Sequence, residues 1–529
     1  MIAQTFTAPR LVVSGLSGGG GKTLVSLGLA RVLTLRGLRV KPCKKGPDYI
    51  DAAWLSLASG RTPTNLDPYF LSDDRLRALF RASFNDADLA IIEGNRGLYD
   101  GRDLEGSCST ATLARALDAP VLLTLTVTKM TRTAAAVVAG LANFEPVRLA
   151  GVILNRVGSS RHADLIRRSI ETYTGIPVLG EIPRLAENPI PERHMGLVSI
   201  HDESPDAPGR AELLTALDGL AALVDSHLDI EAVLRIARSA PELTDADTFW
   251  EEPLEQSSKA ARSPRPLLPE TFPNRGATQG AQPVSAASGA EAERHAVSVE
   301  QPVTIGYVRD AALWFYYEEN FEALRRAGAR LVELSVLSPE PWPAIGELDG
   351  LYLGGGFPEM VPERLSGSPH LEEIRDYSMR NMPIYAECGG FMILCETLRI
   401  DGKDYPMAGL FPARAEFRPQ PQGLGYVEAT VEAENPFHPV GAVLRGHEFH
   451  YSRCVALGDL SPTPRLSPGV GMSGPGHRAK GLAAEGPDNL RSRDGLLVRN
   501  TFAAYTHLFA PAVPHWARRF VAACRGTKK

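Results

Sequence analysis

The stretch that decides the fold of the first half of the chain is Gly15-Leu-Ser-Gly-Gly-Gly-Gly21-Lys22-Thr23. It follows a short apolar run at residues 11–14 and opens a helical pattern at 24–36. A glycine-rich turn between a strand and a helix is the setting of a P-loop, in which backbone N–H groups and the helix N-terminus bind phosphate. Lys22 would neutralise the β- and γ-phosphates of ATP, and Thr23 would offer its hydroxyl to Mg²⁺. The glycines expected to wrap the phosphates are Gly15, Gly18, Gly19, Gly20 and Gly21.

The spacing of this loop is one residue longer than the standard motif, because Leu16 stands where a strict match needs glycine. A chance Gly-Lys-Thr in a glycine-rich turn is the alternative, but a strand and a helix flank the loop as a P-loop requires. Regulatory ATPases of the chromosome-partitioning type carry an additional lysine early in this loop. Ser17 occupies that place here, which argues against that class.

Outward from the loop, as far as about residue 240, short apolar runs alternate with helical patterns. This alternation predicts βαβ units, that is, an α/β fold with a parallel sheet and helices on both faces. The strands expected in this half are 11–14, 38–42, 89–92, 121–125 and 150–154, and the helices are 24–36, 111–117 and 163–172.

A second α/β pattern begins at residue 303. Its expected strands are 303–308, 330–334, 351–353, 383–387 and 426–431, and its expected helices are 314–327 and 515–524. The stretch before it is dense in Pro, Ser, Ala, Gln, Glu and Gly, which is typical of a flexible linker. A Gly/Pro-rich stretch at 467–489 has the composition of a surface insertion. We therefore expect a P-loop domain at 1–245, a linker at 246–302 and a second α/β domain at 303–529.

The composition is that of an ordinary soluble globular protein. The 529 residues are 44% hydrophobic and 22% charged, with 56 basic and 62 acidic side chains and a formal charge of −6. This balance gives no reason to expect nucleic acid or an anionic membrane as a partner, and no apolar run reaches the ~18 residues of a membrane helix. Few cysteines and no CxxC spacing indicate a reducing cytoplasm. The six are Cys43, Cys108, Cys388, Cys395, Cys454 and Cys524.

Two acidic residues follow strands at the edge of the first sheet where Mg²⁺ ligands are needed. Asp48 lies just past one strand and Glu93 ends another. In an open α/β sheet the ligand crevice lies outside the carboxyl ends of the strands, so both acids should lie beside the P-loop. A hard cation that also binds phosphate needs one or two carboxylates and waters. Lys44 or Lys45 could reach a transferred phosphoryl group.

In the second half, Cys388 stands at an expected strand-to-helix turn, in Glu387-Cys388-Gly389-Gly390. Small flanking residues permit a sharp turn that exposes the sulfur, as in nucleophile elbows. The following helix N-terminus should lower the thiol pKa. Upstream, a strand ends in Gly354-Gly355-Gly356, and its N–H groups together with that of Gly389 could form an oxyanion hole.

A thiolate nucleophile needs a base, for which the second half offers three histidines. His447 and His450 lie in Gly446-His447-Glu448-Phe449-His450, and His507 lies in Tyr505-Thr506-His507-Leu508. Residue chemistry alone does not choose among them.

Taken together, these motifs resemble the cobyrinic acid a,c-diamide synthase family. The resemblance spans both halves in order and leaves only the linker and the late insertion outside. It rests on the P-loop and on residues 45–51, 93–101, 151–156, 175–180, 192–194, 353–359, 386–391, 446–452 and 505–508. It implies a dethiobiotin-synthetase-like first domain and a class I glutamine amidotransferase-like second domain.

The resemblance also implies a mechanism. Cys388 would hydrolyse glutamine through a thioester and release ammonia, with His507 as the base. Mg·ATP would phosphorylate a tetrapyrrole carboxylate, and ammonia would then displace phosphate, once at the a and once at the c acetate. Many class I glutaminases carry a glutamate two residues after this histidine, where this chain has Phe509, so the third member of the triad is missing or supplied elsewhere.

Further residues take their expected roles from the same resemblance. Lys45 and Asn155 are expected at ATP. Asp100 and Arg96, which follow Glu93 closely, are expected at the tetrapyrrole. A structural turn held by Asp100 is the competing interpretation.

Some residues depart from the commonest members of the family. Lys45, Asn95-Arg96 and Trp54-Leu55 are more similar to the branch that amidates sirohaem. We expect cobyrinate as the first candidate substrate and sirohaem as the second. Two other classes stay open: a P-loop switch that controls a partner, which would need no cysteine elbow, and a stand-alone glutamine amidase, which would need no intact P-loop. A homodimer is also left open.

Overall fold

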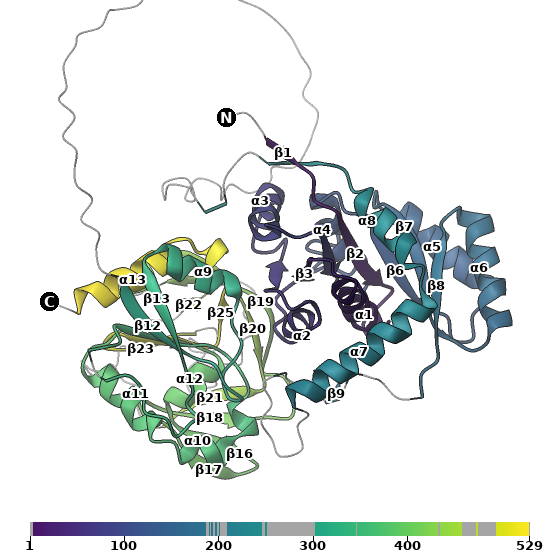
Figure 1. Cartoon of the computed structure of the whole chain (residues 1–529). Coiled ribbons are helices and arrows are strands. Elements are labelled where there is room, and N and C mark those ends of the chain that lie inside the picture. The colour runs from purple at the N-terminus through teal and green to yellow at the C-terminus, as the bar shows by residue number, and fades with distance from the viewer. Residues whose placement is uncertain are drawn as a thin grey trace, which may run out of the picture.

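The computed structural model describes residues 4–186, 190, 192–193, 196–197, 200, 209–245, 249–250, 302–344, 346–431, 434–457, 472–473 and 494–527. The expected linker and the expected insertion fall almost entirely outside these residues. Figure 1 shows the two halves of the chain side by side, with the first in purple to teal and the second in green to yellow.

The first half is built on a seven-stranded sheet in the order β4-β3-β5-β2-β6-β7-β8, in which all neighbouring strands are parallel. The strands are β2 (Arg10–Gly15), β3 (Val40–Lys45), β4 (Thr64–Leu66), β5 (Leu89–Glu93), β6 (Val121–Thr126), β7 (Leu149–Val157) and β8 (Val178–Pro183). The helices are α1 (Lys22–Leu35), α2 (Ile50–Ser59), α3 (Asp73–Phe84), α4 (Thr110–Ala116), α5 (Thr133–Phe144), α6 (Ser160–Thr174), α7 (Arg210–His227) and α8 (Ile230–Arg238).

Helices cover both faces of this sheet, as the sequence predicted. Leu11 and Val13 of β2 pack in one hydrophobic cluster with α1, α2, α7 and α8. Val12, which points to the opposite face, packs in another cluster with α3 and α4. Successive strand residues face opposite sides, so a strand buried on both faces reads as a continuous apolar run. The prediction of a parallel α/β fold is confirmed.

The second half has a six-stranded sheet in the order β13-β12-β14-β15-β24-β23, parallel except for β23. Its strands are β12 (Val303–Val308), β13 (Ala329–Leu334), β14 (Gly350–Leu353), β15 (Ile384–Glu387), β23 (Leu496–Val498) and β24 (Thr501–Ala504). Its helices are α9 (Glu318–Arg326), α10 (Pro362–Ser366), α11 (His370–Met379), α12 (Gly389–Leu394) and α13 (His515–Gly526).

Smaller sheets complete this half. One, in the order β17-β16-β18-β21, contains β16 (Cys395–Ile400), β17 (Lys403–Pro406), β18 (Phe411–Phe417) and β21 (Ser452–Ala456). Another, in the order β22-β19-β20-β25, contains β19 (Gly423–Val431), β20 (Val443–His450), β22 (Met472–Ser473) and β25 (His507–Leu508). Elsewhere, β1 (Gln4–Phe6) pairs with β11 (Leu243–Asp245), and β9 (Glu192–Arg193) pairs with β10 (Gly196–Leu197).

The helix expected from residue 314 begins only at Glu318, so that prediction is wrong for residues 314–317. The backbone N–H groups of Trp314 and Phe315 both donate to the Gly355 carbonyl at 2.9 Å, which ties this segment to the glycine loop after β14. Trp314, Phe315 and Tyr317 are buried in a cluster that includes residues of the first half, whereas Tyr316 packs in a cluster of the second half. Burial against another part of the chain therefore overrides the local helical pattern.

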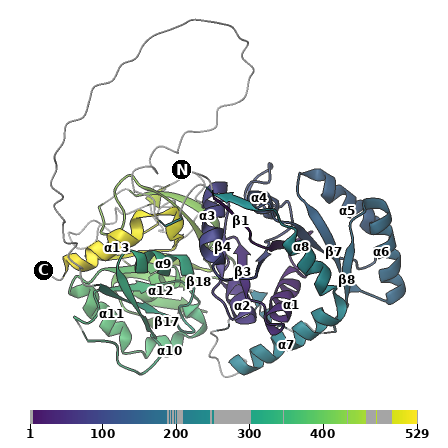
Figure 2. The ribbon, with the colours of Figure 1, turned by 45° about the horizontal axis from the view of Figure 1, so that its top comes forward.

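The two halves share this buried aromatic cluster. Tyr69 stacks on Tyr426 with ring centroids 4.2 Å apart, and its hydroxyl donates to the Val427 carbonyl at 2.9 Å. The Tyr426 hydroxyl donates to Asp67 at 2.7 Å. Figures 1 and 2 both place β3 and α2 of the first half beside the second half. Residues at the carboxyl ends of the first sheet therefore face the second half directly.

The contact between the halves also holds a buried acid, Glu319, which yields a prediction on stability. Glu319 is 5% exposed, and its Oε2 has no hydrogen-bond partner. Burial raises the pKa of Glu319 to about 7 from an ordinary 4.5. The free energy of unfolding therefore holds the whole stabilising contribution of protonated Glu319 below pH 4.5. It falls by on the order of 3 kcal/mol as the pH rises through 7, where the buried acid ionises.

Glu319→Gln should remove that loss, because the amide does not ionise. We expect the thermal unfolding midpoint of the variant to exceed that of the unmodified protein more at pH 8 than at pH 5. The control is Glu318→Gln, since Glu318 is half-buried and pairs with Arg309 at 3.0 Å. An equal difference at both pH values would contradict the assignment of Glu319.

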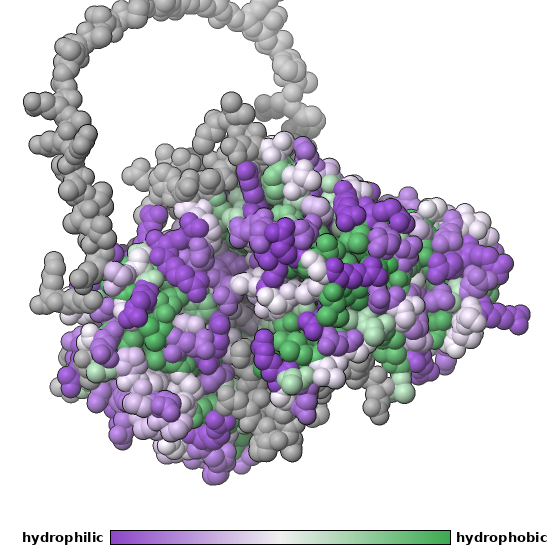
Figure 3. Space-filling model, viewed as in Figure 1, coloured by the Kyte–Doolittle hydropathy of each residue, from purple (hydrophilic) through white to green (hydrophobic). Residues whose placement is uncertain are grey.

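The surface is mixed in character. Figure 3 shows polar and charged residues spread over the face seen in Figure 1, with apolar side chains in small groups between them. No helix within the described part of the chain is both long and apolar enough to cross a membrane.

Candidate active site

The P-loop joins β2 to α1, as its sequence predicted. Gly21 has φ 93°, and a Cβ there would stand 2.2 Å from Asn155 Nδ2, so only glycine fits. Lys22 is buried and its Nζ donates to the Ser17 carbonyl at 2.7 Å. Burial lowers the pKa of the Lys22 ammonium, and the nearby Lys44 lowers it further. The Lys22 ammonium thus lies across the loop expected to hold phosphate.

Glu93 lies directly beside the P-loop, at the end of β5, and is fully buried. Its Oε1 accepts hydrogen bonds from Thr23 Oγ1 at 2.7 Å and from Lys44 Nζ at 3.1 Å. Its Oε2 is buried without a hydrogen-bond partner. Burial raises the pKa of Glu93 to about 7. An unpartnered carboxylate oxygen beside a threonine hydroxyl is a donor set that fits Mg²⁺.

Asp48 and Asp51 follow β3 on the same side of the sheet. Asp51 pairs with Lys44 at 2.6 Å, and Asp48 lies 3.6 Å from the same ammonium. Burial, followed by the neighbouring Asp51, raises the pKa of Asp48 to about 6. Although burial alone would lower it, these carboxylates and Glu93 hold the pKa of Lys44 well above its usual range. Lys44 is therefore already neutralised by three acids.

These acids do not form a closed metal cage. Within the described residues, no group of three or more His, Cys, Asp or Glu side chains is arranged to hold a metal ion. A magnesium ion that shares its ligands with nucleotide phosphates and water does not require such a cage.

The other residues expected at ATP and substrate also lie at this edge. Asn155 donates from Nδ2 to the Gly20 carbonyl at 3.1 Å and so braces the P-loop. Lys45 is buried, and burial lowers the pKa of its ammonium. Arg96 adopts φ 52° at an exposed turn. Asp100 accepts a hydrogen bond from the Gly97 N–H at 2.8 Å, so it holds that turn as well as facing outward.

In the second half, Cys388 forms the sharp elbow that its sequence predicted, but it is only 1% exposed, so the expected exposure of the sulfur is wrong. It lies between β15 and α12 with φ 47°, a strained conformation for a residue other than glycine. Its Sγ lies 3.7 Å from the Phe449 carbonyl oxygen. The expected lowering of the thiol pKa is wrong here. Burial, followed by the charge of Glu359, raises the pKa of Cys388 well above its usual range. The desolvation of a thiol beneath a short helix outweighs the helix N-terminus.

The glycine loop after β14 packs directly on this elbow. The backbone nitrogen of Gly356 lies 2.9 Å from the point where a Cβ on Gly389 would stand, so a side chain at Gly389 would collide with the loop. Gly355 was expected as a third oxyanion donor, but its N–H donates to the Phe315 carbonyl at 3.3 Å. That expectation is wrong because residue 315 forms a β-bridge with Gly355. The Gly356 and Gly389 N–H groups remain beside Cys388.

His507 is the histidine that contacts the glycine loop. A Cβ on Gly355 would lie 2.3 Å from its Cε1, and both of its ring nitrogens lack hydrogen-bond partners. His447 stacks on it at 4.8 Å, and burial followed by His507 lowers the pKa of His447 well below its usual range. His450 Nδ1 lies 2.6 Å from the Ser452 carbonyl oxygen. Of the three histidines, only His507 has both ring nitrogens without a hydrogen-bond partner, whereas His447 and His450 each have one, Nε2.

A cavity of about 570 Å³ lies between the two halves, lined by Asp48 and Asp51 of the first half and by Phe449 of the second, but not by the P-loop, Glu93, Cys388 or His507. Its walls come from the loop after β3, the loop after β5 and strands β19 and β20 of the second half. Phe449, whose carbonyl faces Cys388, also lines it. The lining residues are Lys45, Pro47, Asp48, Tyr49, Ile50, Asp51, Asn95, Arg96, Asp100, Gly101, Arg102, Cys108, Phe315, Leu424, Gly425, Tyr426, His447, Glu448 and Phe449.

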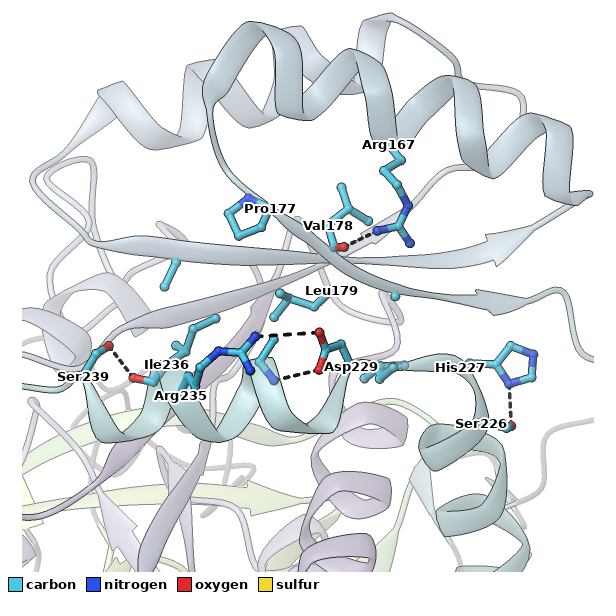
Figure 4. Close-up of a pocket in the computed structure, with 14 residues that line it drawn as sticks. Arg167, Pro177, Val178, Leu179, Ser226, His227, Asp229, Arg235, Ile236 and Ser239 are labelled. Atoms are coloured by element: carbon cyan, nitrogen blue, oxygen red, sulfur yellow. Dashed lines mark hydrogen bonds and ion pairs between the residues drawn. The ribbon is translucent and has the colours of Figure 1, made fainter.

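A second hollow of about 610 Å³ lies at the far edge of the first sheet, beside β8 and α8 (Figure 4). None of the expected site residues lines it. Its charged groups bind neighbouring protein atoms, since Arg235 lies 3.9 Å from Asp229 and Arg167 lies 3.2 Å from Glu181. The chemistry of the chain is therefore assigned to the cavity between the halves.

Comparison with known proteins finds a different family model in each half of the chain. Residues 11–198 match the CobQ/CobB/MinD/ParA nucleotide binding domain, and residues 304–513 match the CobB/CobQ-like glutamine amidotransferase domain. The cobyrinate a,c-diamide synthase of Magnetococcus marinus is 38% identical over 515 residues, covering 97% of this chain and 96% of that protein. The chain belongs to the cobyrinate a,c-diamide synthase family. Membership makes it a glutamine-hydrolysing, ATP-dependent amide ligase.

Two further members of the cobyrinate a,c-diamide synthase family match the chain over nearly its whole length. The cobyrinate a,c-diamide synthase of Archaeoglobus fulgidus is 35% identical over 516 residues, 97% of each chain. The hydrogenobyrinate a,c-diamide synthase of Streptomyces coelicolor is 36% identical over 531 residues, 98% of each chain. The regulatory switch and the stand-alone amidase are therefore set aside.

Sequence reasoning missed several residues of the site. Asp51 lies in the segment 45–51 that carries the family resemblance, but no role was expected for it, although it is the closest acid to Lys44. Tyr49 stacks on Phe315 at 4.9 Å and lies 5.4 Å from the His507 ring, so a residue of the ATP half touches the glutaminase half. The position of Tyr49 between Asp48 and Asp51 after β3 was the sequence signal that could have marked it as a site residue. No sequence signal indicated its contact with the second half.

Proposed function

We propose that this enzyme amidates the a and c acetate carboxylates of a modified tetrapyrrole, with cobyrinate as the first candidate. The observation that carries the proposal is a cavity with Asp48 and Asp51 on one wall and Phe449, whose carbonyl oxygen lies 3.7 Å from Cys388 Sγ, on another. Ammonia released at Cys388 can then meet an activated carboxylate without a separate binding event. Names of relatives that act on cobyrinate or hydrogenobyrinate support the choice of substrate.

In the ATP half, a carboxylate oxygen of the tetrapyrrole attacks the γ-phosphorus of ATP and ADP leaves, which gives an acyl phosphate. Lys22 and the P-loop N–H groups bind the phosphates and stabilise the charge that develops on them. Mg²⁺, held by Glu93, Asp48 and the Thr23 hydroxyl, would supply further neutralisation of that charge. Ammonia attacks the acyl carbon, phosphate departs and a proton is released.

In the glutaminase half, His507 accepts the proton of the Cys388 thiol as the sulfur attacks the amide carbon of glutamine. The Gly356 and Gly389 N–H groups stabilise the oxyanion. The carbon–nitrogen bond then breaks while the proton returns to the departing ammonia, and water hydrolyses the thioester to glutamate. Because burial holds the pKa of Cys388 high, the sulfur depends on this base to become a nucleophile.

The test is mass spectrometry of candidate tetrapyrroles after incubation with ATP, Mg²⁺ and glutamine. We expect cobyrinate to give a monoamide followed by a diamide, with ADP and phosphate as coproducts. Sirohaem is the second candidate, favoured by Lys45, Asn95 and Arg96, which all line the cavity. Amidation of sirohaem but not of cobyrinate would move the enzyme to that branch. Amidation of neither would overturn the proposal.

Asp100→Asn separates substrate handling from loop structure. Asp100 lines the cavity and also accepts the Gly97 hydrogen bond, which the amide oxygen of asparagine can retain. If its charge positions the tetrapyrrole, the monoamide should accumulate while the KM for ATP stays unchanged. The measurement is the ratio of monoamide to diamide together with the ATP KM.

The matched control is Asp103→Asn, because Asp103 makes the same kind of turn contact, to the Ser107 N–H at 2.9 Å, without lining the cavity. The control should leave the product ratio unchanged. A parallel loss of both amidations and of ATP binding in Asp100→Asn would show that Asp100 only holds the loop.

A further inference from the structure

Among the described residues, Glu387, the residue before the proposed nucleophile, makes the closest approach of a carboxylate to His507. Its Oε2 lies 3.7 Å from His507 Nδ1, and the two side chains are 1% and 0% exposed. Within the described residues, this nitrogen is the only basic group within 4 Å of the Glu387 carboxylate. A buried acid facing a buried histidine fixes the ring orientation and stabilises its protonated form.

The carboxylate of Glu387 is itself held in place by neutral donors. Its Oε1 accepts from the Leu508 N–H at 3.0 Å, and its Oε2 accepts from the Tyr352 hydroxyl at 3.1 Å. The Tyr352 hydroxyl in turn accepts from Asn320 Nδ2 at 3.1 Å. A network of this kind gives both carboxylate oxygens a hydrogen-bond donor and orients the carboxylate toward His507.

Phe509, which stands two residues after His507, cannot act in this way. It is fully buried and its ring packs on Tyr317 at 4.9 Å and on Phe70 at 5.2 Å. The other titratable side chains packed on the His507 ring are Tyr49 and His447. Burial raises the pKa of Tyr49 and lowers that of His447, so both are neutral at physiological pH. Among the described residues, Glu387 carries the only carboxylate within 4 Å of a nitrogen of this ring.

We propose that Glu387 is the positioning residue for His507: its carboxylate binds Nδ1–H and leaves Nε2 free to take the proton of Cys388. This deepens the proposed function and rests on its glutaminase half. The acid reaches the histidine from the strand of the nucleophile, since β15 and β24 pair with Glu387 opposite Ala504, shortly before His507. The separation of 3.7 Å is longer than a hydrogen bond, as catalytic contacts often are in structures without substrate.

The test compares Glu387→Gln with two matched variants in assays of glutaminase activity and of ammonia-driven amidation across a range of pH. Tyr352→Phe removes another hydrogen bond to the same carboxylate and leaves His507 untouched. Glu373→Gln removes the acid of a different His–Glu pair in this half, at 2.7 Å from His370 and away from the cavity.

For Glu387→Gln we expect glutaminase kcat to fall by roughly 10²-fold or more, with the KM for glutamine and ammonia-driven amidation unchanged. The acidic limb of the pH profile should move to lower pH, because the amide no longer favours the imidazolium. Tyr352→Phe should leave that limb in place, and Glu373→Gln should match the unmodified enzyme.

Two results would overturn the assignment. One is a Glu387→Gln enzyme with the kcat and pH profile of Glu373→Gln. The other is an equal loss in Glu387→Gln and Tyr352→Phe with an unmoved profile, which would make the carboxylate merely structural. If Glu387→Gln does not fold, Glu387→Asp is the test, because its shorter side chain moves the carboxylate away from His507 Nδ1. The same fall in glutaminase kcat is then expected, and an unchanged kcat would overturn the assignment. Failure of the proposed function itself is distinguishable, because the unmodified enzyme would then release no glutamate.

Discussion

Cys388→Ala is expected to abolish amidation driven by glutamine while amidation driven by free ammonia continues. In the proposed mechanism the sulfur attacks glutamine, and free ammonia enters the reaction after the thioester step. The fold should survive, because alanine also fits a small buried site. The measurement is the rate of amide formation with each nitrogen source, alongside glutamate release.

The other buried cysteines of this half provide the controls. Cys395 and Cys454 are fully buried, and Cys395 Sγ donates to the Phe391 carbonyl at 3.5 Å inside the core. Cys395→Ala and Cys454→Ala should retain the use of glutamine. If either loses it while Cys388→Ala keeps it, the elbow between β15 and α12 does not carry the nucleophile.

Glu93→Gln is expected to stop amidation with either nitrogen source. Glu93 is the buried carboxylate bonded to both Thr23 and Lys44, and its free Oε2 is the oxygen assigned to Mg²⁺. Losing one contact that stabilises transition-state charge costs on the order of 3–4 kcal/mol, or roughly 10²–10³ in rate. The amide keeps the shape of the side chain, so glutamate release without acceptor should persist. Steady-state ADP release in the presence of ammonia measures the effect.

The control for this substitution is Asp88→Asn, at the opposite end of β5. Asp88 pairs on the surface with Arg39 at 2.8 Å and touches neither the P-loop nor the cavity. It should amidate at the unmodified rate. Asp48→Asn should behave like Glu93→Gln, and near-normal turnover with free ammonia in both would remove these acids from the Mg²⁺ site.

The parts of the site that follow from local chemistry were accessible from the sequence. The P-loop needs glycines, a lysine and a threonine in one continuous segment, so its sequence and its structure coincide. The Cys388 elbow likewise needs only a strand, a cysteine and small neighbours. Strands buried on both faces, such as β2, appear as unbroken apolar runs, which is why their bounds were close.

The parts that depend on distant contacts were not accessible. The expected helix does not begin at residue 314 because the N–H groups of Trp314 and Phe315 donate to the Gly355 carbonyl. Gly355 lies in a loop that is remote in sequence. The same bridge occupies the Gly355 N–H and removes it from the oxyanion hole. The high pKa of the Cys388 thiol depends on how much protein covers the sulfur, which no motif records.

Glu387 illustrates the same limit most clearly. It was visible as the residue before the nucleophile, but its relation to His507 depends on the pairing of β15 with β24 and on the position of β25 beside β20. The position two residues after His507, where many class I glutaminases carry the glutamate of the triad, holds a phenylalanine in this chain. The proposed acid comes from another strand, β15, and it lies near His507 only because of how the strands pair in the folded protein.

The central claim is that ammonia made at Cys388 is used at a carboxylate phosphorylated by ATP on the P-loop. The measurement that tests it most directly combines two labels, with ¹⁸O in the acetate carboxylates of the tetrapyrrole and ¹⁵N in the glutamine amide. The account predicts ¹⁵N in each new amide and one ¹⁸O transferred to inorganic phosphate for every amide formed. Amide formation with ¹⁸O in AMP, or with no ¹⁸O in phosphate, would contradict it.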